Sequence, residues 1–181
     1  MPIPCSGSAS CSGALSWLRA SCTLCDHKIE PACGKGNFLA EILGRKLDTV
    51  KSLHANPVMT EWYALRAIAN IYGVDIPADN VHESCDRLFH QATQTGLLWS
   101  SNAQRIAKKI LSCNIICGDT LTMVTHSGKP MVFAEWDIRQ SGTAVRKNVL
   151  FSDMIANGGE STDYISKQYY RWLPNACVKS A

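Results

Sequence analysis

Residues 30–38 read Glu-Pro-Ala-Cys-Gly-Lys-Gly-Asn-Phe, and an amphipathic helical pattern follows at once. Two closely spaced glycines permit a tight turn and a close approach of the backbone to a ligand. The helix that follows offers N–H groups without intrahelical partners in its first turn. A strand, a glycine turn and a helix in this order are typical of nucleotide-type cofactor sites. The carboxylate of Glu30 suits a cationic ligand group better than a pyrophosphate.

Two more acidic residues follow short apolar segments further along the chain. Asp75 comes after residues 71–74, and Asp119 comes after Ile115-Ile116-Cys117-Gly118. In dinucleotide-binding folds an acid at the end of the second strand holds the ribose hydroxyls. Asp75 could instead cap the next helix, although Asp79 is also placed to do so. The hydrophobic periodicity predicts helices at residues 38–50, 60–71, 80–89 and 103–112, the second of them capped by Thr60.

Together these segments resemble the S-adenosylmethionine-dependent methyltransferases, specifically the adenine-N6 DNA methylases. Motif I of that family runs Asp/Glu-Pro-x-x-Gly-x-Gly-x-Phe, and it is matched here by Glu30, Pro31, Gly34, Gly36 and Phe38. Asp75 corresponds to the second motif and Gly118-Asp119 to the third, so the resemblance covers about residues 29–125. It implies an α/β fold of the Rossmann-like class I methyltransferase type, three-layered and with a truncated sheet.

The resemblance also implies a cofactor, a partner and a site. The cofactor is S-adenosylmethionine, whose methionine part would face the glycine turn, its ribose Asp75 and its adenine Asp119. The acceptor would be DNA, methylated directly as in restriction–modification systems, with no metal needed because the protein orients donor and acceptor. The candidate cofactor-binding residues are Glu30, Pro31, Ala32, Gly34, Gly36, Phe38, Asp75, Ile76, Asp119 and Thr120.

One catalytic element of that family is not visible. Its hallmark is Asn/Asp/Ser-Pro-Pro-Tyr/Phe after the fourth strand, and no two of the seven prolines are adjacent. Asn56-Pro57 is interpreted as a helix-breaking turn. The better candidates are Glu135 and Trp136, which would follow a fourth strand at residues 131–134. There the carboxylate could accept from an amino group and the indole could stack on an extruded base.

Composition limits the class of protein. The chain has 181 residues, 46% hydrophobic and 18% charged, and a net charge of +3, as expected for one globular domain. No apolar run approaches the roughly 20 residues of a membrane span, and no secretory signal is evident. These features predict a cytoplasmic protein that does not enter a membrane. Its nine cysteines are then expected to be reduced, with Cys22 and Cys25 a weak candidate for a metal or redox pair.

The chain is predicted to have three parts. Residues 1–28 form a poorly ordered Ser/Cys-rich segment, residues 29–138 the methyltransferase-like domain, and residues 139–181 a tail. The tail offers no further strand of the family's sheet. It carries an aromatic and basic cluster that could stack on single-stranded nucleic acid or serve as a docking or core segment. Arg105, Lys108 and Lys109 could contact phosphate or form a solvated helix face.

Two functions remain open. The chain is either an adenine-N6 DNA methyltransferase, or a catalytically silent cofactor-binding fragment or subunit that acts through a partner completing the site. The missing tetrapeptide favours the second. A small thiol or zinc protein is a third hypothesis, and it rests only on the Cys22 and Cys25 pair.

Overall fold

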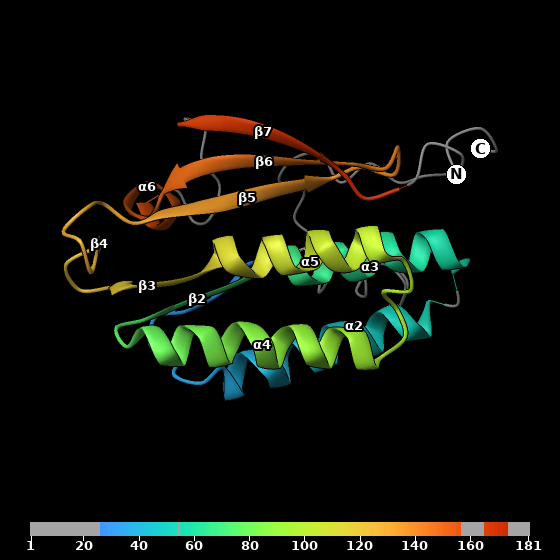
Figure 1. Ribbon diagram of the computed structural model, residues 1–181, viewed down its shortest axis with the longest axis horizontal. Coiled ribbons are helices and arrows are strands. Elements are labelled where there is room, and N and C mark those ends of the chain that lie inside the picture. Colours follow the sequence, from blue (N-terminus) through green and yellow to red (C-terminus); the bar gives the residue numbers. More distant parts are fainter. Residues whose placement is uncertain (1–25, 54, 157–164, 174–181) are drawn as a thin grey trace, which may run out of the picture.

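The structure is a computed structural model that describes residues 26–53, 55–156 and 165–173. It is a mixed α/β fold with a partly parallel sheet and a separate antiparallel sheet (Figure 1). Its elements are β1 (Lys28–Glu30), α2 (Asn37–Ser52), α3 (Pro57–Ala69), β2 (Ile71–Asp75), α4 (Ala78–Gln94), α5 (Ser101–Asn114), β3 (Ile115–Asp119), β4 (Val124–Thr125), β5 (Val132–Ile138), β6 (Thr143–Leu150), α6 (Phe151–Ala156) and β7 (Ser166–Arg171).

The first sheet has the strand order β1-β2-β3-β4. The first three strands are parallel, and a helix pair connects each to the next, as parallel pairing requires. β4 adds two antiparallel residues beside β3. Figure 1 shows α2 and α4 together in one layer, and α3 and α5 in a layer between them and the antiparallel sheet.

The predicted helices are all present, with different ends. The clearest difference is α3, which starts at Pro57 and not at Thr60. The side chain of Asn56 caps it by accepting a hydrogen bond from Met59 N at 2.9 Å, and Pro57 takes the first position, where its missing N–H costs nothing. The expected helix-breaking turn at Asn56-Pro57 is therefore a helix start. Similarly, α5 begins at Ser101 and not at residue 103, and Ser100 caps it, with its Oγ accepting a hydrogen bond from Ala103 N.

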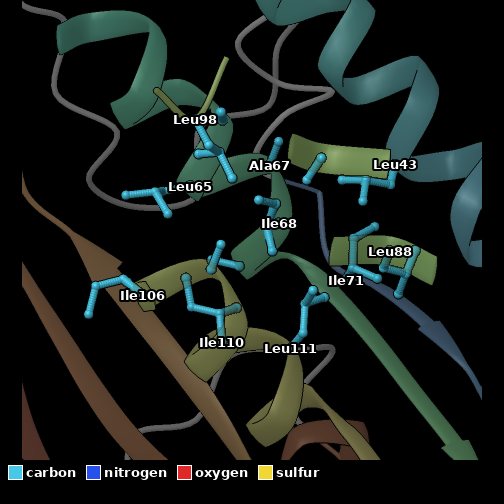
Figure 2. Packing of buried hydrophobic residues seen from close by; sticks show 14 of the residues in the cluster. Leu43, Leu65, Ala67, Ile68, Ile71, Leu88, Leu98, Ile106, Ile110 and Leu111 are labelled. Atoms are coloured by element: carbon cyan, nitrogen blue, oxygen red, sulfur yellow. The ribbon is translucent and has the colours of Figure 1, made fainter. Parts of the chain in front are cut away.

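The main hydrophobic core lies where the helices meet the amino ends of β2 and β3. Figure 2 shows Leu43 of α2, Leu88 of α4, and Ile68 and Ile110 of α3 and α5 converging around Ile71. All five of these residues are fully buried. Burying a side chain of this size contributes about 1.5–3 kcal/mol, so this cluster orients the parallel strands and the loops at their carboxyl ends.

A second cluster joins the two sheets. Tyr72 and Val74 of β2 pack against Phe133 of β5 and Phe151 of α6. The Tyr72 hydroxyl donates to the backbone carbonyl of Ala134 at 3.1 Å in a buried position. One face of the parallel sheet is thus covered by the antiparallel sheet and α6.

The predicted fourth strand does form, but it joins a different sheet. β5 runs from Val132 to Ile138 and pairs antiparallel with β6, which pairs with β7. Residue 138, expected to end the methyltransferase-like domain, ends the first strand of this three-stranded sheet, and the expected tail supplies the other two strands. Alternating strand patterns do not specify which sheet a strand joins, because that depends on pairing between distant segments.

Candidate functional site at the carboxyl edge of the parallel sheet

Three carboxylates end the three parallel strands. Glu30, Asp75 and Asp119 are the last residues of β1, β2 and β3, whereas the sequence predicts that each directly follows its strand. Glu30 pairs with Gly73 and Asp75 pairs with Cys117, so each strand extends two residues beyond its neighbour. The three carboxylates therefore form a stepped series, each offset by two residues from the one on the neighbouring strand. Carboxyl ends of strands in open α/β sheets are where ligands bind.

The three acids also share one face of the sheet. The alternate residues Ile29, Tyr72 and Ile116 pack in the cluster between the sheets. Because side chains alternate between faces along a strand, Glu30, Asp75 and Asp119 belong to the opposite face. On that face, a Cβ on Gly73 would come within 2.9 Å of Leu39 of α2.

No ion pair within the described residues involves these three carboxylates. Their negative charge is therefore not neutralised by a neighbouring lysine or arginine of the described chain. An uncompensated acidic edge attracts cationic ligand groups such as an ammonium or a sulfonium.

The turn after β1 is built by its two glycines. Gly34 and Gly36 have φ angles of 53° and 77°, in the left-handed region that favours glycine. A Cβ on Gly34 would meet nothing within 4 Å, whereas one on Gly36 would collide with the Ser84 hydroxyl of α4. Gly36 is thus required for packing α2 on α4, and Gly34 leaves open space at the edge.

The turn is also tied to its neighbours. Cys33 N donates to Val74 O at 2.8 Å, which extends the pairing of β1 with β2 beyond Glu30. Thr120 Oγ1 donates to Pro31 O at 3.2 Å, which connects the segment after β3 to the same turn. Burial, reinforced by the nearby charge of Asp75, raises the pKa of the Cys33 thiol to about 11. At neutral pH this thiol is protonated, so it is not a nucleophile.

Asp75 has local partners and spare acceptor capacity. Its Oδ1 accepts from Ile76 N at 3.0 Å, and its Oδ2 accepts from the Asn80 amide at 2.8 Å. It therefore anchors the first turn of α4, which has no side-chain cap at Pro77. A carboxylate has about four acceptor positions, so two remain for a pair of hydroxyl groups. The anchoring and ribose-binding roles are compatible.

Asp119, like Asp75, accepts two local hydrogen bonds and keeps spare acceptor positions. Its Oδ1 accepts from Leu121 N at 2.9 Å, and its Oδ2 accepts from Thr122 Oγ1 at 3.1 Å. These bonds shape the turn after β3, in which Met123 has a left-handed φ of 58°. The remaining lone pairs of Asp119 can accept from an amino group.

An exposed apolar side chain follows each of the three acids along the chain. Phe38 is 60% exposed, Ile76 is 59% exposed and Leu121 is 93% exposed, and they follow β1, β2 and β3 respectively. Exposed apolar side chains that gather on one surface are typical of a ligand site. Phe38 and Ile76 were identified from the sequence, but Leu121 was not. The sequence feature that could have identified Leu121 is its position two residues after Asp119. That position points to the site only when Asp119 is known to end a strand.

Glu135 and Trp136 do not lie where the sequence predicts. They are in the middle of β5, opposite Lys147 and Arg146 of β6, and not at the carboxyl end of a parallel strand. Trp136 Nε1 donates to Asn114 Oδ1 at 3.2 Å, and the indole packs against Tyr170.

Asn114 immediately precedes β3, so the Trp136 indole lies beside the amino end of that strand. Asp119 is at the other end, about 13 Å away at the usual rise per residue. The structure therefore does not bring Trp136 together with the three acids.

The remaining expectations concern metals, membranes and the N-terminal thiols. The described residues contain no group of three or more His, Cys, Asp or Glu side chains arranged to hold a metal ion. Among the helices in these residues, none is long and apolar enough to cross a membrane. Cys22 and Cys25 lie outside the described residues.

Comparisons with protein-family models, curated proteins and solved structures found no match to this chain.

Proposed function

We propose that this chain binds S-adenosylmethionine at the edge formed by Glu30, Asp75 and Asp119, and that it is an adenine-N6 DNA methyltransferase. The proposal depends on one observation, the stepped series of three carboxylates with one at the end of each adjacent parallel strand. The strand order β1-β2-β3 is that of one half of a doubly wound dinucleotide-type sheet.

The carboxylate acceptors fit the hydrogen-bond donors of the proposed cofactor. Asp75 would accept from the two ribose hydroxyls, and Asp119 from the adenine amino group. Glu30 would face the ammonium of the methionine part, with Gly34 leaving room for it. The exposed side chains of Ile76 and Leu121 would cover the faces of the adenine ring. The bound cofactor would supply an electrophilic methyl group on a sulfonium, and the protein would orient it toward the acceptor.

A second candidate is a cofactor-binding chain without its own acceptor site. The position of Trp136 favours it, because the indole hydrogen-bonds to Asn114 and packs on Tyr170 inside the fold. It would have to leave both partners to stack on an extruded base. In this case a partner chain would supply the residues that hold adenine.

Titration calorimetry with S-adenosylmethionine tests the site that both candidates share. Asp75→Asn keeps the shape but removes the charge, and hydrogen bonds to charged groups contribute about 1.5–3 kcal/mol. We expect the affinity to fall by about tenfold to a hundredfold. Asn80→Ala is the matched control, since it removes the local partner of Asp75 and leaves the carboxylate free.

The outcomes separate binding from local folding. If Asn80→Ala weakens binding as much as Asp75→Asn, the loss of affinity comes from a change in the first turn of α4 and not from a lost hydrogen bond to the ribose. Absence of heat at millimolar S-adenosylmethionine in the wild-type chain would refute both candidates.

Transfer of a radiolabelled methyl group from the cofactor to DNA then separates the two candidates. The methyltransferase predicts labelled N6-methyladenine, whereas the silent chain predicts cofactor binding without label in DNA. If the indole stacks on the base, Trp136→Ala should abolish labelling while Trp136→Phe retains much of it, because a phenyl ring can also stack. If Trp136 only packs against Tyr170, any loss of labelling in Trp136→Ala should be matched by a loss of stability and of cofactor binding.

A further inference from the structure

A groove of about 440 Å³ lies between α4, α5 and β7, away from the acidic edge. Arg105, Lys108 and Lys109 of α5 line one side of it, and Phe89 of α4 and Tyr170 of β7 contribute rings. In the sequence, the basic residues 105–109 and the aromatic residues of the tail at 139–181 are two separate segments. The fold brings them together, since β7 packs against α5.

The basic side chains occupy one face of α5. Positions 108 and 109 lie three and four residues after position 105, and all three are exposed, whereas Ile106 and Ala107 between them are buried. Side chains at this spacing have Cβ atoms about 5–6 Å apart along the helix surface. The result is a cluster of three cations on about one turn of α5 beside the groove, which suits a ligand with several closely spaced negative charges.

The positive charge of this cluster is not balanced by ion pairs with acids of the described residues. Within the described residues no ion pair involves Arg105, Lys108 or Lys109, although Arg45, Lys51 and Arg87 on other helix faces each pair with an acid. Arg105 donates to a backbone carbonyl, that of Arg171, and Lys108 lies 4.7 Å from the Phe89 ring centroid. Among the described residues that line the groove, Asp86 is the one acid.

We infer that this groove binds the phosphate backbone of a DNA strand. A nucleic acid strand carries one phosphodiester charge per nucleotide, and lysines and arginines that neutralise these charges release condensed counterions. The Tyr170 ring packs against Trp136 and is half-buried, and the part of it that lines the groove offers a surface on which a base can stack. The inference stands on the groove alone and holds whether or not the acidic edge binds a cofactor.

The test uses fluorescence anisotropy of a labelled DNA single strand and of the matching duplex. The groove variant carries Arg105→Gln, Lys108→Gln and Lys109→Gln, all at exposed positions. The control removes the same charge elsewhere, with Arg45→Gln, Lys51→Gln and Lys129→Gln, which are also exposed.

Three lost phosphate contacts change the salt dependence by a known amount. The slope of log K against log salt should fall in magnitude by about 2 for a single strand and about 2.7 for a duplex. At about 0.1 M salt, the same contacts correspond to roughly a hundredfold weaker binding of the single strand. Asp86→Asn should strengthen binding severalfold, an effect that a merely structural role would not produce.

Three results would overturn the inference. They are no binding of either DNA form by the wild-type chain at about 100 µM, an equal loss in the control variant, and an unchanged salt slope in the groove variant. Titration of the groove variant with S-adenosylmethionine should match the wild type, so failure here is distinguishable from failure of the proposed function.

Discussion

Gly36 and Gly34 lie two residues apart in the same turn, yet replacing each by alanine should have different consequences. Both have a left-handed φ, at which an L-residue costs about 1–2 kcal/mol. Alanine recovers about 0.4–1 kcal/mol by restricting the unfolded chain. Nothing lies within 4 Å of a Cβ on Gly34. We therefore expect Gly34→Ala to lower the free energy of unfolding by only about 1 kcal/mol.

At Gly36 the new methyl group also meets α4. It would collide with the Ser84 hydroxyl and lie 3.0 Å from Ser84 Cβ and 3.1 Å from Ser84 Cα. Overpacking of this kind costs about 1–3 kcal/mol, since helix backbone cannot move aside cheaply. Gly36→Ala should thus lower stability by about 3 kcal/mol, or about 2 kcal/mol more than Gly34→Ala.

Thermal unfolding followed by circular dichroism measures this difference. For a chain of this size, 2 kcal/mol corresponds to roughly 4–8 °C in Tm. Combining Gly36→Ala with Ser84→Gly removes the Ser84 hydroxyl and Cβ and leaves only the contact with Cα, so the double variant should be more stable than the sum of the single changes predicts. Equal Tm values for the two alanine variants, or strictly additive changes in the double variant, would show that α2 does not depend on close contact with α4 at Gly36.

Three further predictions concern buried polar groups. Burial raises the pKa of Glu61 against the opposing hydrogen bonds from Ser100. The contribution of this shift to stability is therefore present below the ordinary pKa of 4.5 and is lost as pH rises through the higher folded value. Glu61→Gln should flatten this pH dependence in urea unfolding measured from pH 4.5 upward. Tyr72→Phe removes the bond to the Ala134 carbonyl and should cost about 0.5–1.5 kcal/mol, and no loss would mean that this bond does not hold the two sheets together. Cys33, whose pKa is raised to about 11, should resist alkylation at pH 8 in the folded chain and react after unfolding, as read by mass mapping.

Local patterns were sufficient for the helices and for the ends of the parallel strands. The apolar periodicity before Asp75 and Asp119 and the turn after Glu30 depend on neighbours within a few residues, which the sequence displays directly. The exact helix starts were less certain. Asn56 and Thr60 are both good caps by type, and only the backbone geometry selects Asn56.

The sequence by itself determined that three acids end three strands beside a glycine turn, because strand, turn and helix signals act over short distances. Only the tertiary structure decided which sheet β5 joins, and hence that Trp136 lies at the amino end of β3, because strand pairing depends on contacts between distant segments. The same long-range packing explains why Gly36 must be glycine, and it places the cations of α5 beside Tyr170 of β7.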